Sequence, residues 1–166
     1  LINAMLFVIK EVPDASLLLI GSFRTPSYKK QVVDEIERLG LIKNISLKNH
    51  VLHSDIWEIL ARHKIGVIPF NDNPLTRYAT PTKLFEFMAA GCLIVCPDLS
   101  PMRRYDVTGA NFFIPGDIVS LGNSIINAIK KVSNKNILKN QLKVKSEYNW
   151  DNNSSELINV YERLLS

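Results

Sequence analysis

The stretch PTKLFEFMAAGCLIVCPD, residues 81–98, decides the fold class, because it joins a short apolar helix to a fully apolar strand. Proline is favoured in the first turn of a helix and glycine just after its last turn, so Pro81 and Gly91 bracket the helix. The run CLIVC is apolar on both faces, which is typical of a buried strand in a parallel sheet. Glu86 is the only acid in this helix, and a carboxylate between two phenylalanines needs an explanation.

The same alternation of apolar runs and amphipathic stretches covers the whole chain. Strands are predicted over residues 16–21, 44–48, 64–70, 92–96 and 110–115. Helices are predicted over residues 27–39, 136–147 and 153–165, after a cap at Ser54 or Asp55, and around Leu121 to Ile129. This order indicates an α/β fold, a Rossmann-like doubly wound parallel sheet with helices on both faces. Ligands of such folds bind at the carboxyl ends of the strands, so the loops after the strands are the candidate site.

Composition sets limits on the class of protein. The chain has 166 residues, 46% of them apolar and 22% charged, with a net charge of +4, which fits one soluble globular domain. The lysines between residues 130 and 145 are interpreted as solvated helix surface and not as a nucleic-acid patch. No apolar run is long enough for a transmembrane helix, and the first residues lack the features of a signal peptide. Cys92 and Cys96 are expected to be buried, reduced thiols.

The residues TPTK that open the helix predict an anion site. Thr80 is a good cap ahead of Pro81, and the N–H groups of Thr82, Lys83 and Leu84 would point out of the helix start. With the helix dipole and the Lys83 ammonium, these groups would bind a phosphate. The alternative is a well-capped helix whose first turn simply faces water.

Glu86 lies one turn further along this helix and favours a nucleotide. A carboxylate offers acceptors and no donor, which matches a pair of neighbouring hydroxyls such as a ribose diol. A phosphate-binding helix start followed by such an acid describes a nucleotide site. The alternative is that Glu86 is a solvated helix residue.

The sequence resembles a known family over nearly its full length. PTKLFEFMAAGCLIVCPDL, LLLIGSF, NISLKNHVLHSDIWEILARHKIGVIPF, FFIPGDIVSLGNSIINAI and YNWDNNSSELINVYERLL are similar to successive segments of retaining GT-B glycosyltransferases of the glycosyl transferases group 1 type. They match the C-terminal, donor-nucleotide-binding domain of that family. The resemblance implies one nucleotide-sugar-binding domain over residues 1–166, with a core at 1–149 and a C-terminal helix at 150–166.

The resemblance also implies roles for particular residues. Glu86 falls where the family holds the donor ribose hydroxyls, and Thr82, Lys83 and Leu84 fall where backbone amides meet the donor phosphates. The other positions implied to line the donor site are Gly21 and Ser22 by their backbone, Arg24 toward phosphate, and Asn49, His50 and Val51 at the nucleobase edge. For Arg24 the alternative is an ordinary surface residue. No catalytic residue is assigned.

Two departures from the family pattern stand out. Tyr78 occupies the position where the family often has a glutamate that touches the donor sugar, and Asn71, Asp72 and Arg77 are alternative sugar or phosphate contacts. The second departure is truncation, because Ile2, Met5, Leu6 and Ile9 recur at helical spacing and the chain is therefore expected to open inside a helix. The family's basic pair and its N-terminal acceptor-binding domain would precede residue 1.

Metal and cofactor sites are not expected. His50 and His53 have no third ligand at metal spacing, and His63 is interpreted as a surface residue. The resemblance implies a nucleotide-diphosphate sugar as the donor substrate and no separate cofactor, metal or nucleic acid. It implies a cytoplasmic location, with peripheral contact at the inner membrane face as an option for the whole protein.

The predicted function is the donor-binding part of an enzyme that moves a hexose to an acceptor hydroxyl in polysaccharide or glycoconjugate synthesis, and this chain alone is expected to be inactive. Two alternatives are a fragment of a GT-B-fold nucleotide-sugar epimerase and a non-catalytic assembly module with a decayed site. The last helix carries an apolar stripe that is either exposed and able to drive self-association or packed on its own sheet; its residues are Leu157, Val160, Tyr161, Leu164 and Leu165.

Overall fold

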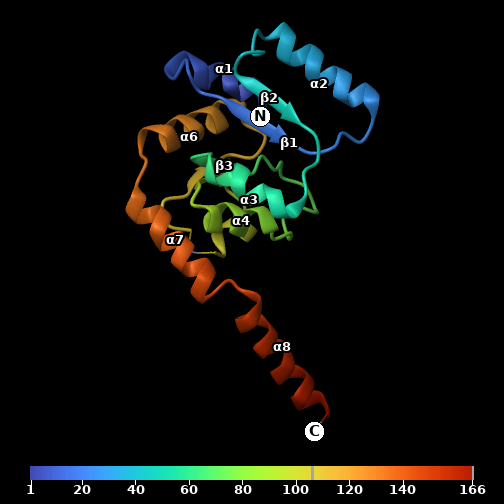
Figure 1. Cartoon of the computed structure of the whole chain (residues 1–166), viewed down its shortest axis with the longest axis vertical. Coiled ribbons are helices and arrows are strands. Elements are labelled where there is room, and N and C mark those ends of the chain that lie inside the picture. Colours follow the sequence, from blue (N-terminus) through green and yellow to red (C-terminus); the bar gives the residue numbers. More distant parts are fainter. Residues whose placement is uncertain (106, 166) are drawn as a thin grey trace.

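A computed structural model describes residues 1–105 and 107–165. Helices and strands alternate up to residue 130 and two more helices follow, as the sequence predicts (Figure 1). The helices are α1 Ile2–Glu11, α2 Pro26–Arg38, α3 His53–Ala61, α4 Thr82–Ala90, α5 Ser100–Arg103, α6 Ile118–Lys130, α7 Asn134–Ser146 and α8 Trp150–Leu165. The strands are β1 Leu17–Ile20, β2 Ile45–Lys48, β3 Ile65–Val67, β4 Leu93–Pro97 and β5 Asn111–Phe113.

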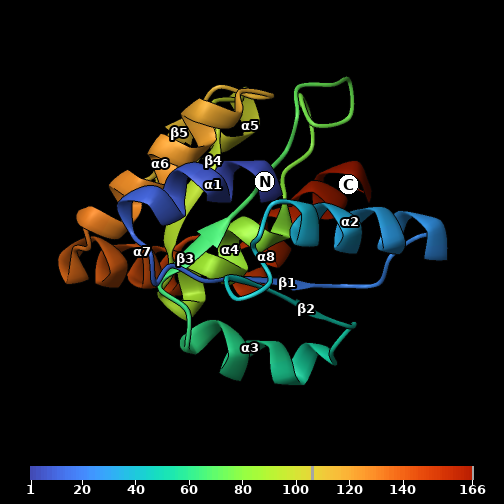
Figure 2. The ribbon, with the colours of Figure 1, turned by 90° about the horizontal axis from the view of Figure 1, so that it is seen from above.

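All strand pairs in the described residues are parallel, and helices cover both faces (Figure 2). The α/β fold class predicted from the sequence is therefore confirmed. The strands form two separate sheets, however: β1 pairs with β2, and β3, β4 and β5 pair in that order. β1 and β3 are both edge strands, whereas the sequence analysis expected a single sheet.

Two buried clusters hold the sheets and helices together. The first joins α1, α2 and α6 to β4 and to one face of β1 and β3, through residues such as Met5, Ile36 and Ile125. The second packs α4 and α5 against the other face of β4, with Leu84 and Met88 at its centre. Because β4 lies between the two clusters, every one of its residues is buried, which explains its continuous apolar sequence.

Both cysteines are buried and free, as predicted. Burial raises the pKa of the Cys92 thiol to about 11 and that of the Cys96 thiol to about 12, because the thiolate form loses its hydration. Cys92 directs its Sγ toward the backbone carbonyl of His63, at 3.4 Å. The two thiols therefore act as small core residues.

Several predicted boundaries were wrong. α4 begins at Thr82 with Pro81 at the N-cap, so Thr80 does not cap it; its hydroxyl lies 3.2 Å from that of Tyr105 instead. α3 begins at His53 after Leu52, so the predicted caps lie inside its first turn. β1 is half-buried and not buried, because one of its edges has no neighbouring strand. The short helix α5 was not anticipated.

The last two helices differ in how they are attached. α7 packs on α4, where the Gln141 side-chain amide donates to the carbonyl of Ala89. α8 extends away from the rest of the molecule, and the residues of its predicted apolar stripe are exposed (Figure 1). The alternative that this stripe packs on its own sheet is therefore wrong. No helix in residues 1–105 or 107–165 is long and apolar enough to cross a membrane.

Candidate functional site

The start of α4 exposes unpaired backbone donors. The N–H groups of Thr82 and Lys83 have no hydrogen-bond partner among the residues that the structure describes, whereas that of Leu84 bonds to the carbonyl of Pro81 at 3.0 Å. Thr82 and Lys83 are exposed, and Leu84 is fully buried. Two of the three predicted phosphate donors are thus available, and they lie at the positive end of the helix dipole.

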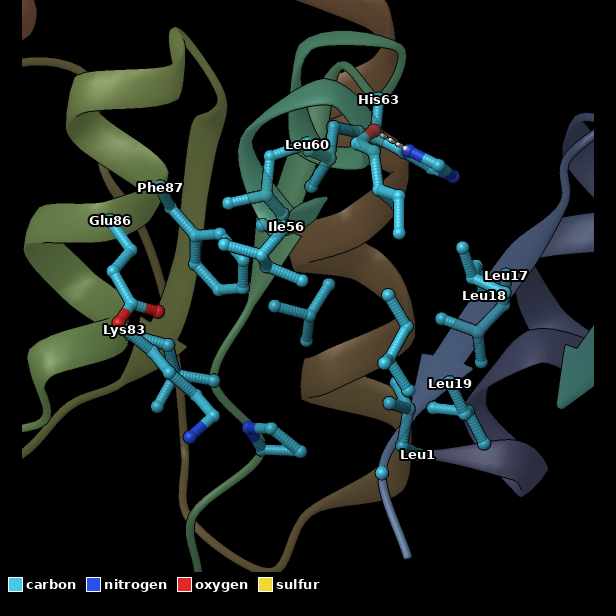
Figure 3. A pocket seen from close by; sticks show the side chains of 18 of the residues that line it. Leu1, Leu17, Leu18, Leu19, Ile56, Leu60, His63, Lys83, Glu86 and Phe87 are labelled. Atoms are coloured by element: carbon cyan, nitrogen blue, oxygen red, sulfur yellow. Dashed lines mark hydrogen bonds between the residues drawn. The ribbon is translucent and has the colours of Figure 1, made fainter. Parts of the chain in front are cut away.

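Lys83 and Glu86 lie on the wall of a cavity of about 480 Å³, which we call the β1–β3 cavity. Figure 3 shows these two side chains on the α4 side, opposite the leucines of β1, with side chains of α3 between the two sides. The rest of the wall is mostly apolar and comes from β1, β3, α3 and the segments that follow the two strands. Glu86 is half-buried, which excludes the alternative of a fully solvated residue.

Packing on either side of Glu86 fixes its direction. Phe85 points into an aromatic cluster, with ring centroids 4.9 Å from Tyr105 and 5.4 Å from Tyr148. Phe87 points to the cavity side and lies over Gly66 of β3, where a Cβ would overlap its ring. Because both neighbours are held by packing, Glu86 is presented at the cavity and not to bulk solvent.

Three other predicted residues line the same cavity. Gly21 follows β1 with a φ of 148°, a backbone conformation in which a residue with a side chain would be strained. His50 and Val51 follow β2. The structure therefore brings Gly21, His50 and Val51 together with Lys83 and Glu86. These residues come from the carboxyl ends of two strands and from the first turns of one helix, where an α/β fold places its ligand.

The remaining predicted residues lie beside this cavity or away from it. Ser22 and Arg24 line a second hollow of about 620 Å³ that shares Leu19, Ile20 and Gly21 with the first. Asn49 is exposed and lines neither hollow. The predicted nucleobase segment is thus only partly on the cavity wall.

The loop between β3 and α4 holds the residues that the sequence analysis named as alternative sugar or phosphate contacts. None of them lines either hollow. Arg77 donates to both carboxylate oxygens of Asp72, at 2.6 and 3.1 Å, and this lowers the pKa of the Asp72 carboxyl. Tyr78 is 82% exposed, and Asn71 is also exposed. Arg77 and Asp72 therefore bind each other, and neither they nor Tyr78 reaches the cavity in this structure.

Two features of the structure were missed or misread in the sequence. Arg103 donates to both carboxylate oxygens of Asp98 just after β4 and lies 3.7 Å over the ring of Phe112. The sequence signal that could have predicted this pair is an acid directly after a strand, followed by an arginine five residues later. His63 was interpreted as a surface residue, but its ring is half-buried on the cavity wall with Nδ1 2.7 Å from the carbonyl of Ile59.

The described residues of the site do not form a set of metal ligands. Within residues 1–105 and 107–165, no group of three or more histidine, cysteine, aspartate or glutamate side chains is placed to hold a metal ion. The arrangement offers instead two backbone donors, one ammonium and one carboxylate at the edge of an apolar cavity. Such a set can bind an anion and a hydroxyl-bearing group side by side.

Comparison with known proteins identifies the family of this chain. The family model described as Glycosyl transferases group 1 matches residues 1–131. A comparison with curated proteins gives no match.

Solved structures show the same fold at low sequence identity. Sucrose-phosphate synthase from Thermosynechococcus elongatus superposes with a TM-score of 0.82 at 15% identity, over 99% of this chain and 42% of that protein. HepE of Anabaena, solved in complex with UDP-glucose, gives a TM-score of 0.76 at 16% identity, over 97% of this chain and 45% of that protein. The C-terminal domain of LpcC, a glycosyl transferase group 1 family protein from Francisella tularensis, gives 0.72 at 18% identity, over 90% of this chain and 77% of that domain. The chain thus spans less than half the length of the first two proteins.

Proposed function

Because the chain belongs to the glycosyl transferases group 1 family, we propose that it binds the nucleotide-diphosphate part of a sugar donor in the β1–β3 cavity and at the start of α4. The observation that carries this proposal is the convergence of Gly21, His50, Val51, Lys83 and Glu86 on one cavity. HepE, which shares the fold, was solved with UDP-glucose bound, and this supports a nucleotide sugar as the ligand class.

Each part of the site has a distinct role in the proposal. The N–H groups of Thr82 and Lys83, the helix dipole and the Lys83 ammonium would bind the diphosphate. Glu86 would accept hydrogen bonds from the two ribose hydroxyls, as a carboxylate without donors can. His50 and Val51 would contact the nucleobase, and the backbone at Gly21 would approach the donor closely.

In the whole protein, the reaction would be transfer of a hexose from the donor to an acceptor hydroxyl, with retention of anomeric configuration. The helix start and Lys83 would stabilise the negative charge that develops on the departing diphosphate. Glu86 would orient the donor and would not act as a base. The proposed reaction uses no separate cofactor, and its setting would be polysaccharide or glycoconjugate synthesis on the cytoplasmic side of the membrane.

Calorimetric titration with UDP, GDP and ADP tests the donor site. We expect one of them to bind, and Glu86→Gln to weaken that binding roughly tenfold or more, because a hydrogen bond to a charged group contributes about 1.5–3 kcal/mol. Glu156→Gln on the exposed part of α8 is the matched control and should leave the affinity unchanged.

Two further ligands separate the ribose contact from the phosphate contact. A 2′,3′-dideoxynucleoside diphosphate should bind the wild-type chain as weakly as the natural one binds Glu86→Gln. Inorganic pyrophosphate should bind the Glu86→Gln variant with the same affinity as the wild-type chain, but it should bind the Lys83→Met variant more weakly. If none of the three nucleotides binds at millimolar concentration, the proposed donor site is wrong and an assembly module is favoured.

A further inference from the structure

The outer face of α7 carries exposed lysines and leucines in a part of the chain that has no acid. Between Asp117 and Glu147 the sequence contains six lysines and neither aspartate nor glutamate. Figure 1 shows α7 at the edge of the molecule, with α4 on its inner side. The inner residues of α7, which pack on α4 or bond to the loop before β5, are Ile137, Asn140, Gln141 and Val144. The exposed residues on its opposite side, which we call the α7 face, are Lys135, Leu138, Lys139, Leu142 and Lys145.

The two leucines lie in the middle of the α7 face. At about 100° of rotation per residue, the five positions fall within an arc of about 120°. In this arc Lys145 lies on one side of the leucines, and Lys135 and Lys139 lie on the other. Leu138 is 57% exposed and Leu142 is 56% exposed. A single exposed leucine is ordinary, but two leucines one turn apart between cations are typical of a helix that lies on a bilayer surface.

The lysines of the α7 face are not neutralised by acids of the protein. Among residues 1–105 and 107–165, none of the three forms an ion pair, whereas Lys130 bonds to Glu11 at 3.0 Å. The first acid that follows them in the sequence is Glu147, beyond the last turn of α7. Their positive charge attracts an anionic surface and repels a second copy of the same face.

α8 also exposes apolar residues, but its charges have the opposite sign. Its acids are Asp151, Glu156 and Glu162, and its one basic residue is Arg163. An anionic surface would therefore attract the α7 face and repel α8. The charges thus separate the partner of the α7 face from the partner of the apolar stripe on α8.

We propose that the α7 face binds the surface of a lipid bilayer that contains anionic lipids. The lysine ammonium groups would contact the phosphates of the headgroups, while their methylene stems and the two leucines enter the headgroup region. α7 would lie on the bilayer and would not cross it. Because α7 packs directly on α4, this contact would hold the helix that carries Lys83 and Glu86 one helix layer from the lipid.

Nucleic acid is another anionic partner, and the composition of the face argues against it. Bound nucleic acid would leave both leucines in water, and the α7 face has no aromatic side chain on which a base could stack. The inference is also independent of the proposed donor site. No residue of α7 lines the β1–β3 cavity or the second hollow, so nucleotide binding and membrane binding can fail separately.

Co-sedimentation of the whole chain with lipid vesicles tests the proposal. One set of vesicles contains phosphatidylcholine and phosphatidylglycerol in equal amounts, and the other contains phosphatidylcholine alone. We expect at least tenfold tighter binding to the anionic vesicles. This binding should weaken as NaCl rises from about 0.1 to about 1 M, because the screening length falls from about 10 to about 3 Å.

Removal of the charges should abolish most of the binding. The variant Lys135→Gln/Lys139→Gln/Lys145→Gln should bind the anionic vesicles about a hundredfold more weakly, because each lysine near such a surface contributes about fivefold. Glutamine is a good helix former, so α7 should stay folded, and urea unfolding of each variant checks this.

The matched control removes the same net charge elsewhere. Lys10→Gln/Lys29→Gln/Lys43→Gln changes three exposed lysines outside α7 and should weaken binding by less than about fivefold.

Two leucine variants separate α7 from α8. Leu138→Gln/Leu142→Gln keeps every charge and should weaken binding about tenfold, because the apolar contact with the lipid is lost. Leu157→Ser/Leu164→Ser on α8 should bind the anionic vesicles as the wild-type chain does.

Three outcomes would overturn the proposal. The first is an equal loss of binding in the two lysine variants, since net charge alone would then explain it. The second is equal binding, or no binding, of the wild-type chain to the two kinds of vesicle. The third is full vesicle binding by the Leu138→Gln/Leu142→Gln variant together with tighter binding of a single-stranded oligonucleotide, since the α7 face would then be a nucleic-acid site.

Discussion

At the scale of single residues, the position of Glu86 depends on what its neighbours pack against. Phe85 is fixed by two tyrosine rings and Phe87 by the bare backbone of Gly66. The sequence indicated that Glu86 was unusual, because it was the only acid in an apolar helix. It could not indicate that Phe87 needs a glycine on a neighbouring strand, because the two residues are 21 positions apart and meet only in the fold.

Gly66→Ala should therefore destabilise the protein. A Cβ at this position would overlap the Phe87 ring, and forcing one methyl group into a packed site costs about 1–3 kcal/mol. Urea unfolding followed by circular dichroism measures this loss in the free energy of unfolding.

The double variant Gly66→Ala with Phe87→Leu provides the control. If the ring causes the loss, the double variant should be more stable than the sum of the two single changes predicts, since contacting residues couple. Strict additivity would show that Gly66 is required for some other reason.

At the scale of secondary-structure elements, the sequence predicted most helices and strands but not all of their ends. The proline and glycine that bracket residues 81–91 were interpreted correctly as limits of a helix, but Pro81 is the N-cap and Thr80 bonds elsewhere. The Thr80 hydroxyl has a tertiary partner, Tyr105, which no local pattern reveals. Local rules therefore identify an element better than they identify the residue at which it starts.

Asn140 shows how α7 is attached to the rest of the structure. This side chain is buried, accepts from the N–H of Thr108 and donates to the carbonyl of the same residue, at 2.9 and 3.1 Å. The sequence analysis interpreted the lysines around it as solvated helix surface. An asparagine on such a helix gives no local sign that it bonds to a loop 32 residues away.

Asn140→Ala should lower the free energy of unfolding by about 1–3 kcal/mol, because it leaves two backbone groups of Thr108 without partners. Lys139→Ala on the exposed face of the same helix is the matched control and should change stability by less than about 0.5 kcal/mol. Urea unfolding measures both. An equal effect of the two variants would mean that α7 contributes through its helix propensity alone.

At the scale of the whole molecule, the parts are a covered α/β body and one projecting helix. The body holds β4 between two apolar clusters, whereas the apolar stripe of α8 is exposed to solvent (Figure 1). Scattered exposed apolar residues are ordinary, but a continuous stripe along one helix marks an interaction surface.

We expect the chain to self-associate through α8 as its concentration rises. Burial of the stripe formed by Leu157, Val160, Tyr161, Leu164 and Leu165 against an apolar surface would provide the free energy. Sedimentation velocity over a hundredfold concentration range measures the association. The variant Leu157→Ser/Leu164→Ser should remain monomeric, and Lys30→Ser on the exposed face of α2 should behave as wild type. A wild-type chain that stays monomeric throughout would contradict this expectation.

The sequence by itself determined the α/β class, the parallel strands, the reduced thiols and the helix that carries Lys83 and Glu86. These features follow from local periodicity and from residue types, which act over a few neighbouring positions. Only the tertiary structure decided that Gly21, His50 and Val51 share a cavity with this helix, that Arg77 pairs with Asp72 and that His63 is half-buried. It alone also separated β1 from β3, because strand neighbours are chosen by long-range backbone pairing that no local pattern of side chains records.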